Sequence, residues 1–234
     1  MNRSRVRSPW LAQNLIFQNY IMKKVLLSLA FSMPFLFASA QSNKKIEFGI
    51  NGGLSLYNLT NRQIYSENNY KAGFAAGVAV SIPIAKSFYI QPEALYQQQG
   101  SKYANLTTSI SKADYEMRFG YVNFPLLAKY QLFNSNLSIY AGPQLGILTN
   151  AKYILTVSGT DINGKYETDI KKDVNTIDFS GAYGLEYYFA IGGNSKIVLN
   201  ARYNTGFSHV MKSEESRDAK SKNTGFTFMV GYRF

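Results

Sequence analysis

Large apolar residues occupy every second position in eight separate stretches of this chain of 234 residues. A period of two is typical of β-strands whose two faces meet different surroundings. Seven of the stretches lie at 46–56, 73–84, 88–99, 116–130, 137–148, 177–189 and 197–207. The eighth ends the chain and places five apolar residues on one face, namely Phe226, Phe228, Val230, Tyr232 and Phe234. The pattern predicts an all-β protein of eight strands.

The connections between these stretches alternate between short and long. Short turns rich in Gly, Asn and Ser are expected at 85–87, 133–136 and 191–195. Longer polar loops are expected at 58–70, 102–115, 150–175 and 209–223. Short turns at one end and long loops at the other are typical of an outer-membrane barrel with meander topology. An even number of antiparallel strands lets the first strand pair with the last, and both chain ends then lie at the short-turn, periplasmic end.

The composition of the two strand faces indicates which one points outward. One face is aliphatic and aromatic, and the other carries Gly, Ala, Ser, Gln, Asn, Tyr and a few charges. A soluble core made from the second face would hold many polar groups that need partners. A soluble, lipocalin-like barrel with the first face inside is the alternative. Tyrosines near the strand ends suit the two aromatic girdles of a membrane barrel: Tyr57, Tyr96, Tyr130, Tyr187, Tyr203 and Tyr232. We therefore predict an eight-stranded antiparallel up-and-down transmembrane β-barrel.

The N-terminal part has the features of an export signal. Residues 22–40 combine two lysines after Met22, an apolar run, and Ala-Ser-Ala, as in a secretory signal peptide. Residues 1–21 precede it and are interpreted as a mis-called leader, so that 41–234 forms a single barrel domain. Without the five basic residues of 1–40, the chain keeps 20 basic and 14 acidic residues, a net charge of +6. This balance points to anionic lipid or surface sugars as partners and not to nucleic acid.

Several blocks resemble the PorT-like outer-membrane β-barrel family of Bacteroidota. They are "PEALYQQQGSK" (92–102), "YVNFPLLAKYQL" (121–132), "YAGPQLGIL" (140–148), "GLEYYF" (184–189) and "NARYNTGFSHV" (200–210). The resemblance covers essentially all of 44–234 and implies a barrel in the outer membrane. It implies no single activity, although one family member is linked to a secretion and gliding apparatus. The C-terminal strand that ends on Phe234 also resembles the signal by which the barrel-assembly machinery recognises its clients.

Charged residues assigned to the polar face are expected to fill the lumen. They are Glu47, Glu93, Arg118, Lys129, Glu186, Arg202 and Arg233. An eight-stranded barrel is only wide enough inside for its own side chains, and ionised groups in such a lumen must pair. We expect a salt-bridged structural network here. The alternative is a carboxylate pair, Glu93 and Glu186, that performs acid–base chemistry.

A serine and a histidine near the rim of the barrel raise a functional alternative. Ser208 and the single histidine, His209, lie near the lip of the barrel, where a lipid-active hydrolase would place such a pair, with Glu214 or Glu215 to orient the histidine. With one His and no Cys, we expect no transition-metal site and no cofactor.

Residues 150–175 alternate over 153–157 and contain Asn163-Gly164, which predicts a protruding hairpin with its turn there. The open edge of this hairpin would suit an envelope or extracellular partner that binds by strand addition. The sequence thus favours a non-enzymatic, monomeric barrel that binds outer-membrane lipid and a protein partner. A rim hydrolase or a narrow solute pore are the alternatives.

Overall fold

A computed structural model describes residues 45–60, 68–107, 111–133, 135–159, 163–212 and 221–234. The expected leader and signal peptide lie outside these residues. The described strands are β1 (Glu47–Leu59), β2 (Asn68–Pro83), β3 (Phe88–Thr107), β4 (Ser111–Gln131), β5 (Leu137–Gly159), β6 (Asn163–Asp169), β7 (Ile177–Gly192), β8 (Ser195–Gly206) and β9 (Asn223–Arg233). Among the same residues, no helix is long and apolar enough to cross a membrane.

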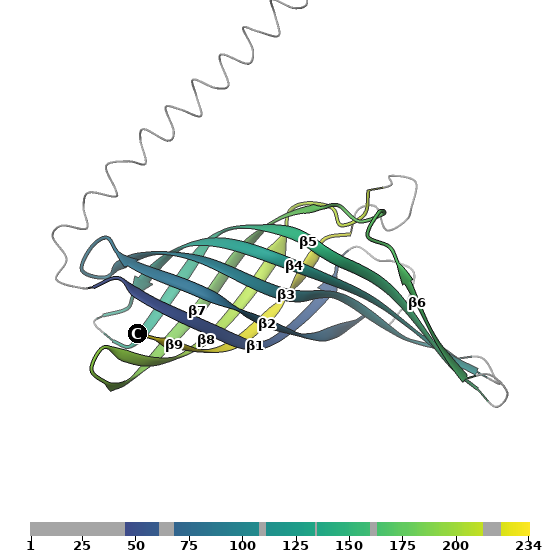
Figure 1. Ribbon diagram of the computed structural model, residues 1–234, viewed down its shortest axis with the longest axis horizontal. Coiled ribbons are helices and arrows are strands. Elements are labelled where there is room, and N and C mark those ends of the chain that lie inside the picture. Colours follow the sequence, from purple (N-terminus) through teal and green to yellow (C-terminus); the bar gives the residue numbers. More distant parts are fainter. Residues whose placement is uncertain (1–44, 61–67, 108–110, 134, 160–162, 213–220) are drawn as a thin grey trace, which may run out of the picture. The chain divides into compact units, whose positions relative to one another are not determined.

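Eight of the strands close into a ring in which every neighbour is antiparallel. The order is β4-β3-β2-β1-β9-β8-β7-β5, and a β4–β5 pairing closes it (Figure 1). The first and last strands pair from Gly49↔Arg233 to Leu59↔Asn223. The predicted meander barrel is therefore confirmed. β6 is a ninth strand, which lies outside the ring and pairs with β5.

The two faces of the strands are distributed as the membrane interpretation requires. In β9, Phe228 and Val230 are exposed outward, at 49% and 57%. Thr227, which precedes Phe228, points inward and is fully buried. The same alternation recurs around the ring, with large apolar side chains exposed and Gln, Asn, Ser and charged side chains buried. Since a soluble barrel would bury its apolar face, the lipocalin-like alternative is wrong.

Both ends of the barrel chain lie beside the short turns. Phe48 and Phe234 exchange backbone hydrogen bonds of 3.3 and 2.9 Å at this end, and Figure 1 places the C-terminus there with the short turns. The segments 84–87, 132–133 with 135–136, and 193–194 lie between their strands as expected. We call this the short-turn end and the opposite one the long-loop end.

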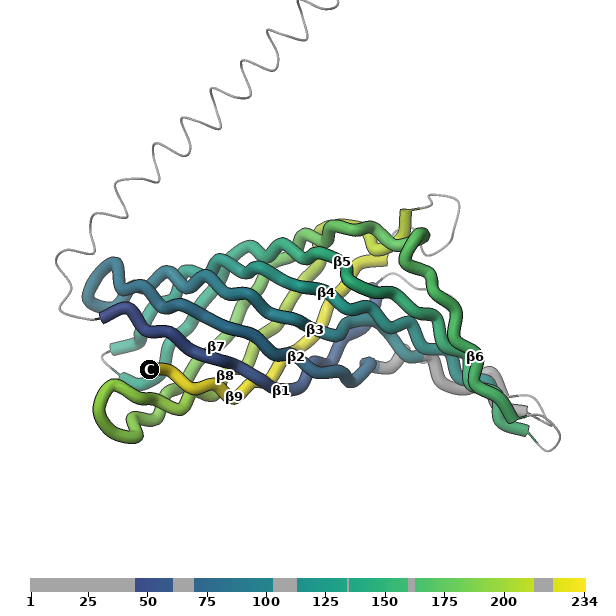
Figure 2. The backbone as a smooth tube through the Cα atoms, in the orientation of Figure 1, coloured from purple at the N-terminus to yellow at the C-terminus, as the bar shows by residue number. Residues whose placement is uncertain are grey.

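The long-loop end differs from the expected polar loops. β3 and β4 continue to pair at Tyr103↔Tyr115 and Leu106↔Ala113, inside the expected 102–115 loop. β5 also continues and pairs with β6, which confirms the hairpin. Asn163 and Gly164 are strand residues opposite Ser158 and Val157, so the turn was predicted a few residues too late. Together, 101–107, 111–117, 153–159 and β6 form a sheet that continues past the barrel, which we call the extension (Figure 2).

Candidate functional site: a filled lumen and a sheet extension

A bidentate ion pair crosses the middle of the lumen. Nη2 of Arg202 on β8 donates to both carboxylate oxygens of Glu93 on β3, at 2.9 and 2.8 Å. Both side chains are almost completely buried, at 0% and 1% exposure. Arg202 Nε also donates to the Tyr140 hydroxyl at 3.2 Å, and that hydroxyl donates to Asn200 at 2.7 Å. Both charges are thus paired and hydrogen-bonded, as burial demands.

A second charged group lies next to the first, towards the short-turn end. Lys129 Nζ donates to Glu186 at 2.8 Å, and Arg233 Nη2 donates to the other oxygen of Glu186 at 3.4 Å. Gln91 links the two groups, because it accepts from Lys129 at 2.7 Å and donates to Glu93 at 2.8 Å. The lumen therefore contains one continuous charged network that joins strands on opposite sides of the barrel.

Neutral polar side chains fill the next layer towards the long-loop end. Gln97 accepts from Asn123 at 2.9 Å and from the Tyr57 hydroxyl at 3.3 Å, and it donates to Thr227 at 2.6 Å. Asn204 donates to Gln144 at 3.1 Å. These bonds bridge β1, β3, β4, β5, β8 and β9 across the interior.

Apolar side chains close the long-loop mouth above this layer. The cluster consists of Leu59, Met117, Phe119, Tyr121, Leu148, Ala151, Val174 and Val210. Val174 and Val210 come from the segments after β6 and β8, which meet at the Val174↔Met211 bridge. At the short-turn end, a cavity of about 20 Å³ lies between Lys129, Glu186 and Arg233, which is room for about one water molecule. The described side chains therefore fill the lumen along its length.

The structure brings five of the seven expected lumen residues into the charged network: Glu93, Lys129, Glu186, Arg202 and Arg233. Glu47 lies at the short-turn rim, where it pairs with Lys196. Arg118 does not lie in the lumen, and its expected place there was wrong. Its side chain is 38% exposed on the outer face and pairs with Glu116 at 2.9 Å.

Sequence reasoning named none of the neutral lumen partners as site residues. Examples are Gln91, Gln97 and Asn51, which accepts from Arg233 Nη1 at 2.7 Å. All three have the parity of the inward face, so the alternation itself marks them as lumenal. They were not predicted because only charged residues were considered as lumen candidates. The carboxylates Glu93 and Glu186 are each held by cations, an arrangement that suits a structural network.

The rim residues do not form the arrangement that a hydrolase needs. Ser208 Oγ donates to Asp178 at 2.9 Å and accepts from the backbone N–H of Phe179 at 2.8 Å. His209 is exposed, and its carbonyl oxygen accepts from Asn175 at 2.9 Å. No hydrogen bond joins the Ser208 and His209 side chains among the described residues. Glu214 and Glu215 lie outside the described part of the chain.

Salt bridges stabilise the hairpin of β5 and β6. Glu167 accepts from both Lys165 and Lys152, each at 3.0 Å. These hydrogen bonds lower the pKa of the Glu167 carboxyl to about 2, so it stays ionised at physiological pH. Within the described chain, β6 pairs with β5 alone, which leaves its second edge without a strand partner. No set of three or more His, Cys, Asp or Glu among the described residues is placed to hold a metal ion.

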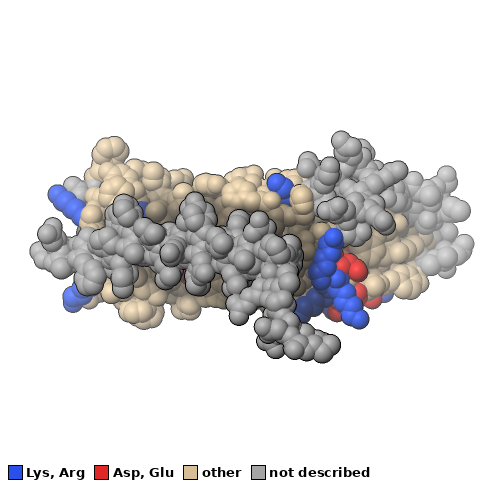
Figure 3. Space-filling model, turned by 90° about the horizontal axis from the view of Figure 1, so that it is seen from above, with Lys and Arg blue, Asp and Glu red and all other residues tan. Residues whose placement is uncertain are grey.

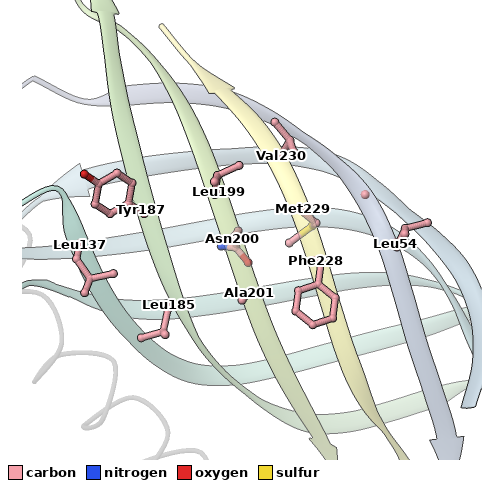
Figure 4. A pocket seen from close by; sticks show the side chains of 11 residues that line it. Leu54, Leu137, Leu185, Tyr187, Leu199, Asn200, Ala201, Phe228, Met229 and Val230 are labelled. Carbon is pink, nitrogen blue, oxygen red and sulfur yellow. The ribbon is translucent and has the colours of Figure 1, made fainter.

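A shallow apolar groove of about 550 Å³ lies on the outer surface over β7, β8 and β9 (Figure 4). Ala201 lies between Leu185 and Phe228 in the strand register, and its small side chain leaves room there. Tyr187 and Val230 also line the groove. The lining is apolar apart from the Tyr187 hydroxyl and the buried Asn200, so the groove belongs to the apolar flank of the barrel.

Comparisons with known proteins agree with this architecture. A family model described as the outer membrane protein β-barrel domain matches residues 37–212. A search of curated proteins finds no match.

Three of the solved structures that resemble the chain illustrate the comparison. Ail, the attachment invasion locus protein of Yersinia pestis, is 14% identical, with 82% of this chain and 100% of Ail covered and a TM-score of 0.43. Neisserial surface protein A is 12% identical, with coverages of 81% and 98% and a TM-score of 0.37. The outer membrane protease OmpT of Escherichia coli is 10% identical, with coverages of 81% and 96% and a TM-score of 0.39. At these values the likenesses say nothing of activity.

Proposed function

The chain belongs to the outer membrane protein β-barrel domain family, and from that premise we propose that it is a non-enzymatic, PorT-like barrel that binds a protein partner through the extension. The five sequence blocks shared with PorT-like proteins support the narrower family. The partner would be an envelope or extracellular protein, in keeping with the secretion-associated role known for one PorT-like protein. The barrel would act as a monomer.

The proposed orientation places the short turns and both chain ends in the periplasm. Bacterial outer-membrane barrels have short periplasmic turns and longer external segments. The extension then projects from the outer face of the membrane. In this orientation, the C-terminal strand is the one presented to the barrel-assembly machinery during biogenesis.

The free edge of β6 is the observation that carries the proposal. An exposed edge strand offers backbone N–H and C=O groups that a partner strand can pair with. Lys165, Glu167 and Asp169 place one positive and two negative charges along this edge strand. Charges on an edge strand suppress pairing with arbitrary strands, so a partner strand must carry complementary charges.

The two alternative functions, a solute pore and a rim hydrolase, lack such support. A pore needs an open path, whereas a hydrogen-bonded polar layer and an apolar cluster of described residues cross this lumen. A Ser–His hydrolase needs the Ser208 hydroxyl beside the His209 imidazole, whereas among the described residues Ser208 donates to Asp178 instead.

Shortening the hairpin should abolish partner binding without unfolding the barrel. Residues 155–166 are replaced by Asn-Gly, which joins the cross-strand pair Ile154 and Glu167 with a two-residue turn. A photo-cross-linking residue at Asp169, present in both proteins, should give a higher-mass adduct in cells with the full hairpin and none with the short one.

The same cross-linking residue at Lys86, in a short turn, controls for contacts made during barrel assembly. A band that shifts on boiling verifies that both proteins are folded barrels. An Asp169 adduct of equal yield in the two proteins, or its absence in both, would contradict the proposed role of the hairpin.

A further inference from the structure

Four hydrogen-bond donors gather on the outer surface of β3, β4 and β5 at the base of the extension. Asn150 Nδ2 lies 3.4 Å from the Tyr96 hydroxyl. Both side chains lie over Gly120, where an added Cβ would come within 2.5 Å of Asn150 Nδ2 and 2.7 Å of the Tyr96 oxygen. One step further along the strands, Arg118 and Lys152 face each other as direct ladder partners. We call Tyr96, Arg118, Asn150 and Lys152 the outer ledge.

The outer ledge lies where the apolar band of the barrel ends. Outward positions of β4 are apolar from Tyr130 to Val122, then Gly120 follows and Arg118 is the first charge. Ten residues of strand from Tyr130 to Gly120 span about 33 Å, or about 25 Å across a membrane at the usual tilt. That is the height of the lipid-facing band of outer-membrane barrels, so Arg118 and Lys152 lie at the level of lipid headgroups.

The positive charge at this level is concentrated on one flank. On β1 and β8, the first polar outward positions past the apolar band, Asn58 and Thr205, are neutral, and one cation, Lys222, precedes β9, one outward position past Thr224. Figure 3 shows a cluster of Lys and Arg with Asp and Glu beside it on the face seen there. A general requirement for charge at the membrane boundary would have placed cations around the whole ring. The local gathering points to a ligand on this side.

The ledge cations are held by carboxylates but not saturated by them. Arg118 donates Nε and Nη2 to Glu116, at 3.0 and 2.9 Å, and Nη1 donates to none of the described residues. Lys152 shares Glu167 with Lys165. Lys102 lies opposite Glu116 in the ladder, Lys71 pairs with Glu116 at 3.8 Å, and Asp114 lies in one row with Lys165. Five cations (Lys71, Lys102, Arg118, Lys152, Lys165) thus face four carboxylates (Asp114, Glu116, Glu167, Asp169). The salt bridges orient the cations, and the group keeps a net positive charge.

We propose that the outer ledge binds the phosphate group of a lipid headgroup in the leaflet at the long-loop end. Guanidinium and ammonium groups bind phosphate through charge-assisted hydrogen bonds, and basic sites at the membrane surface recognise anionic headgroups. The Tyr96 hydroxyl and the Asn150 amide supply neutral donors on the membrane side of the cations. The inference rests on the barrel crossing the membrane and is independent of the partner proposed for β6.

Native mass spectrometry of the full barrel in detergent tests this site. The probes are diphosphoryl lipid A and the same lipid without its phosphates. We expect preferential binding of the phosphorylated lipid, reduced on the order of tenfold or more in the Arg118→Gln/Lys152→Gln variant. A Lys45→Gln/Lys86→Gln variant, with the same charge change at exposed positions of the short-turn end, should bind like the parent. Heat-shifted gel bands confirm that each variant is folded.

Three results would overturn the assignment. The ledge variant could bind diphosphoryl lipid A as tightly as the parent, or the parent could bind both lipids equally. Inorganic phosphate alone could also bind as strongly as the lipid, which would make free phosphate the ligand. Because the assay is performed in micelles, none of these results depends on the orientation or on the partner of the extension.

Discussion

Replacing Arg202 with Met should lower the free energy of unfolding of the barrel by about 3–5 kcal/mol, because it leaves a buried carboxylate without its cation. Glu93 is 1% exposed, and both of its oxygens accept from Arg202. Urea titration of the refolded protein in detergent measures the loss. Replacing both partners, as Glu93→Leu/Arg202→Met, should recover most of it, since the penalty comes from the unpaired charge and not from the missing bond.

Lys196→Met provides the matched control for this prediction. Lys196 pairs with Glu47 at the short-turn rim, where the two side chains are 25% and 26% exposed. A partly solvated pair contributes about 1 kcal/mol or less. If Arg202→Met costs no more than Lys196→Met, the charged network does not stabilise the barrel as described.

Replacing Phe234 with Ala should deplete the protein from the outer membrane far more than it destabilises the folded barrel. The side chain is 58% exposed and its ring packs on Phe48 at 6.5 Å, whereas the backbone bonds that close the barrel are kept in the variant. Loss of this ring pair costs about 0.5–1.5 kcal/mol. Quantitative blotting of outer-membrane fractions, beside urea titration of the refolded protein, separates the two effects.

Phe48→Ala removes the same ring pair from the other strand and leaves the C-terminal residue intact. It should reach the outer membrane in nearly normal amounts. Equal depletion of the two variants would show that Phe234 acts as a lipid-facing anchor and not as part of an assembly signal.

The alternation of apolar residues predicted the barrel because each membrane strand has lipid on one side and the lumen on the other. Thr227 and Phe228 illustrate this contrast, at 0% and 49% exposure. The rule fails in the extension, where neither face meets lipid. The sequence 102–115 lacks a clear period, and its strands were expected to be a loop. β6 was recognised only as part of a hairpin, since its residues are almost all exposed.

The candidate site was less predictable than the fold. Glu93 and Arg202 are 109 residues apart, and their contact depends on how the strands are staggered around the closed ring. Arg118 shares the parity of outward Val122 and Phe124, so its position outside the lumen follows from the alternation. The expectation that a charged residue belongs in the lumen overrode that signal. The outer ledge needed the ladder register, because Arg118 and Lys152 come from different strands.

The central claim is that the extension faces the cell exterior, and cysteine labelling tests it most directly. The chain contains no Cys, so a single cysteine at Lys165 in the extension or at Lys86 in a short turn reports without background. Both positions are exposed. With a membrane-impermeant maleimide on intact cells, we expect labelling of Lys165→Cys, and labelling of Lys86→Cys only after the outer membrane is permeabilised. Labelling of Lys86→Cys alone in intact cells would place the extension in the periplasm and contradict the account.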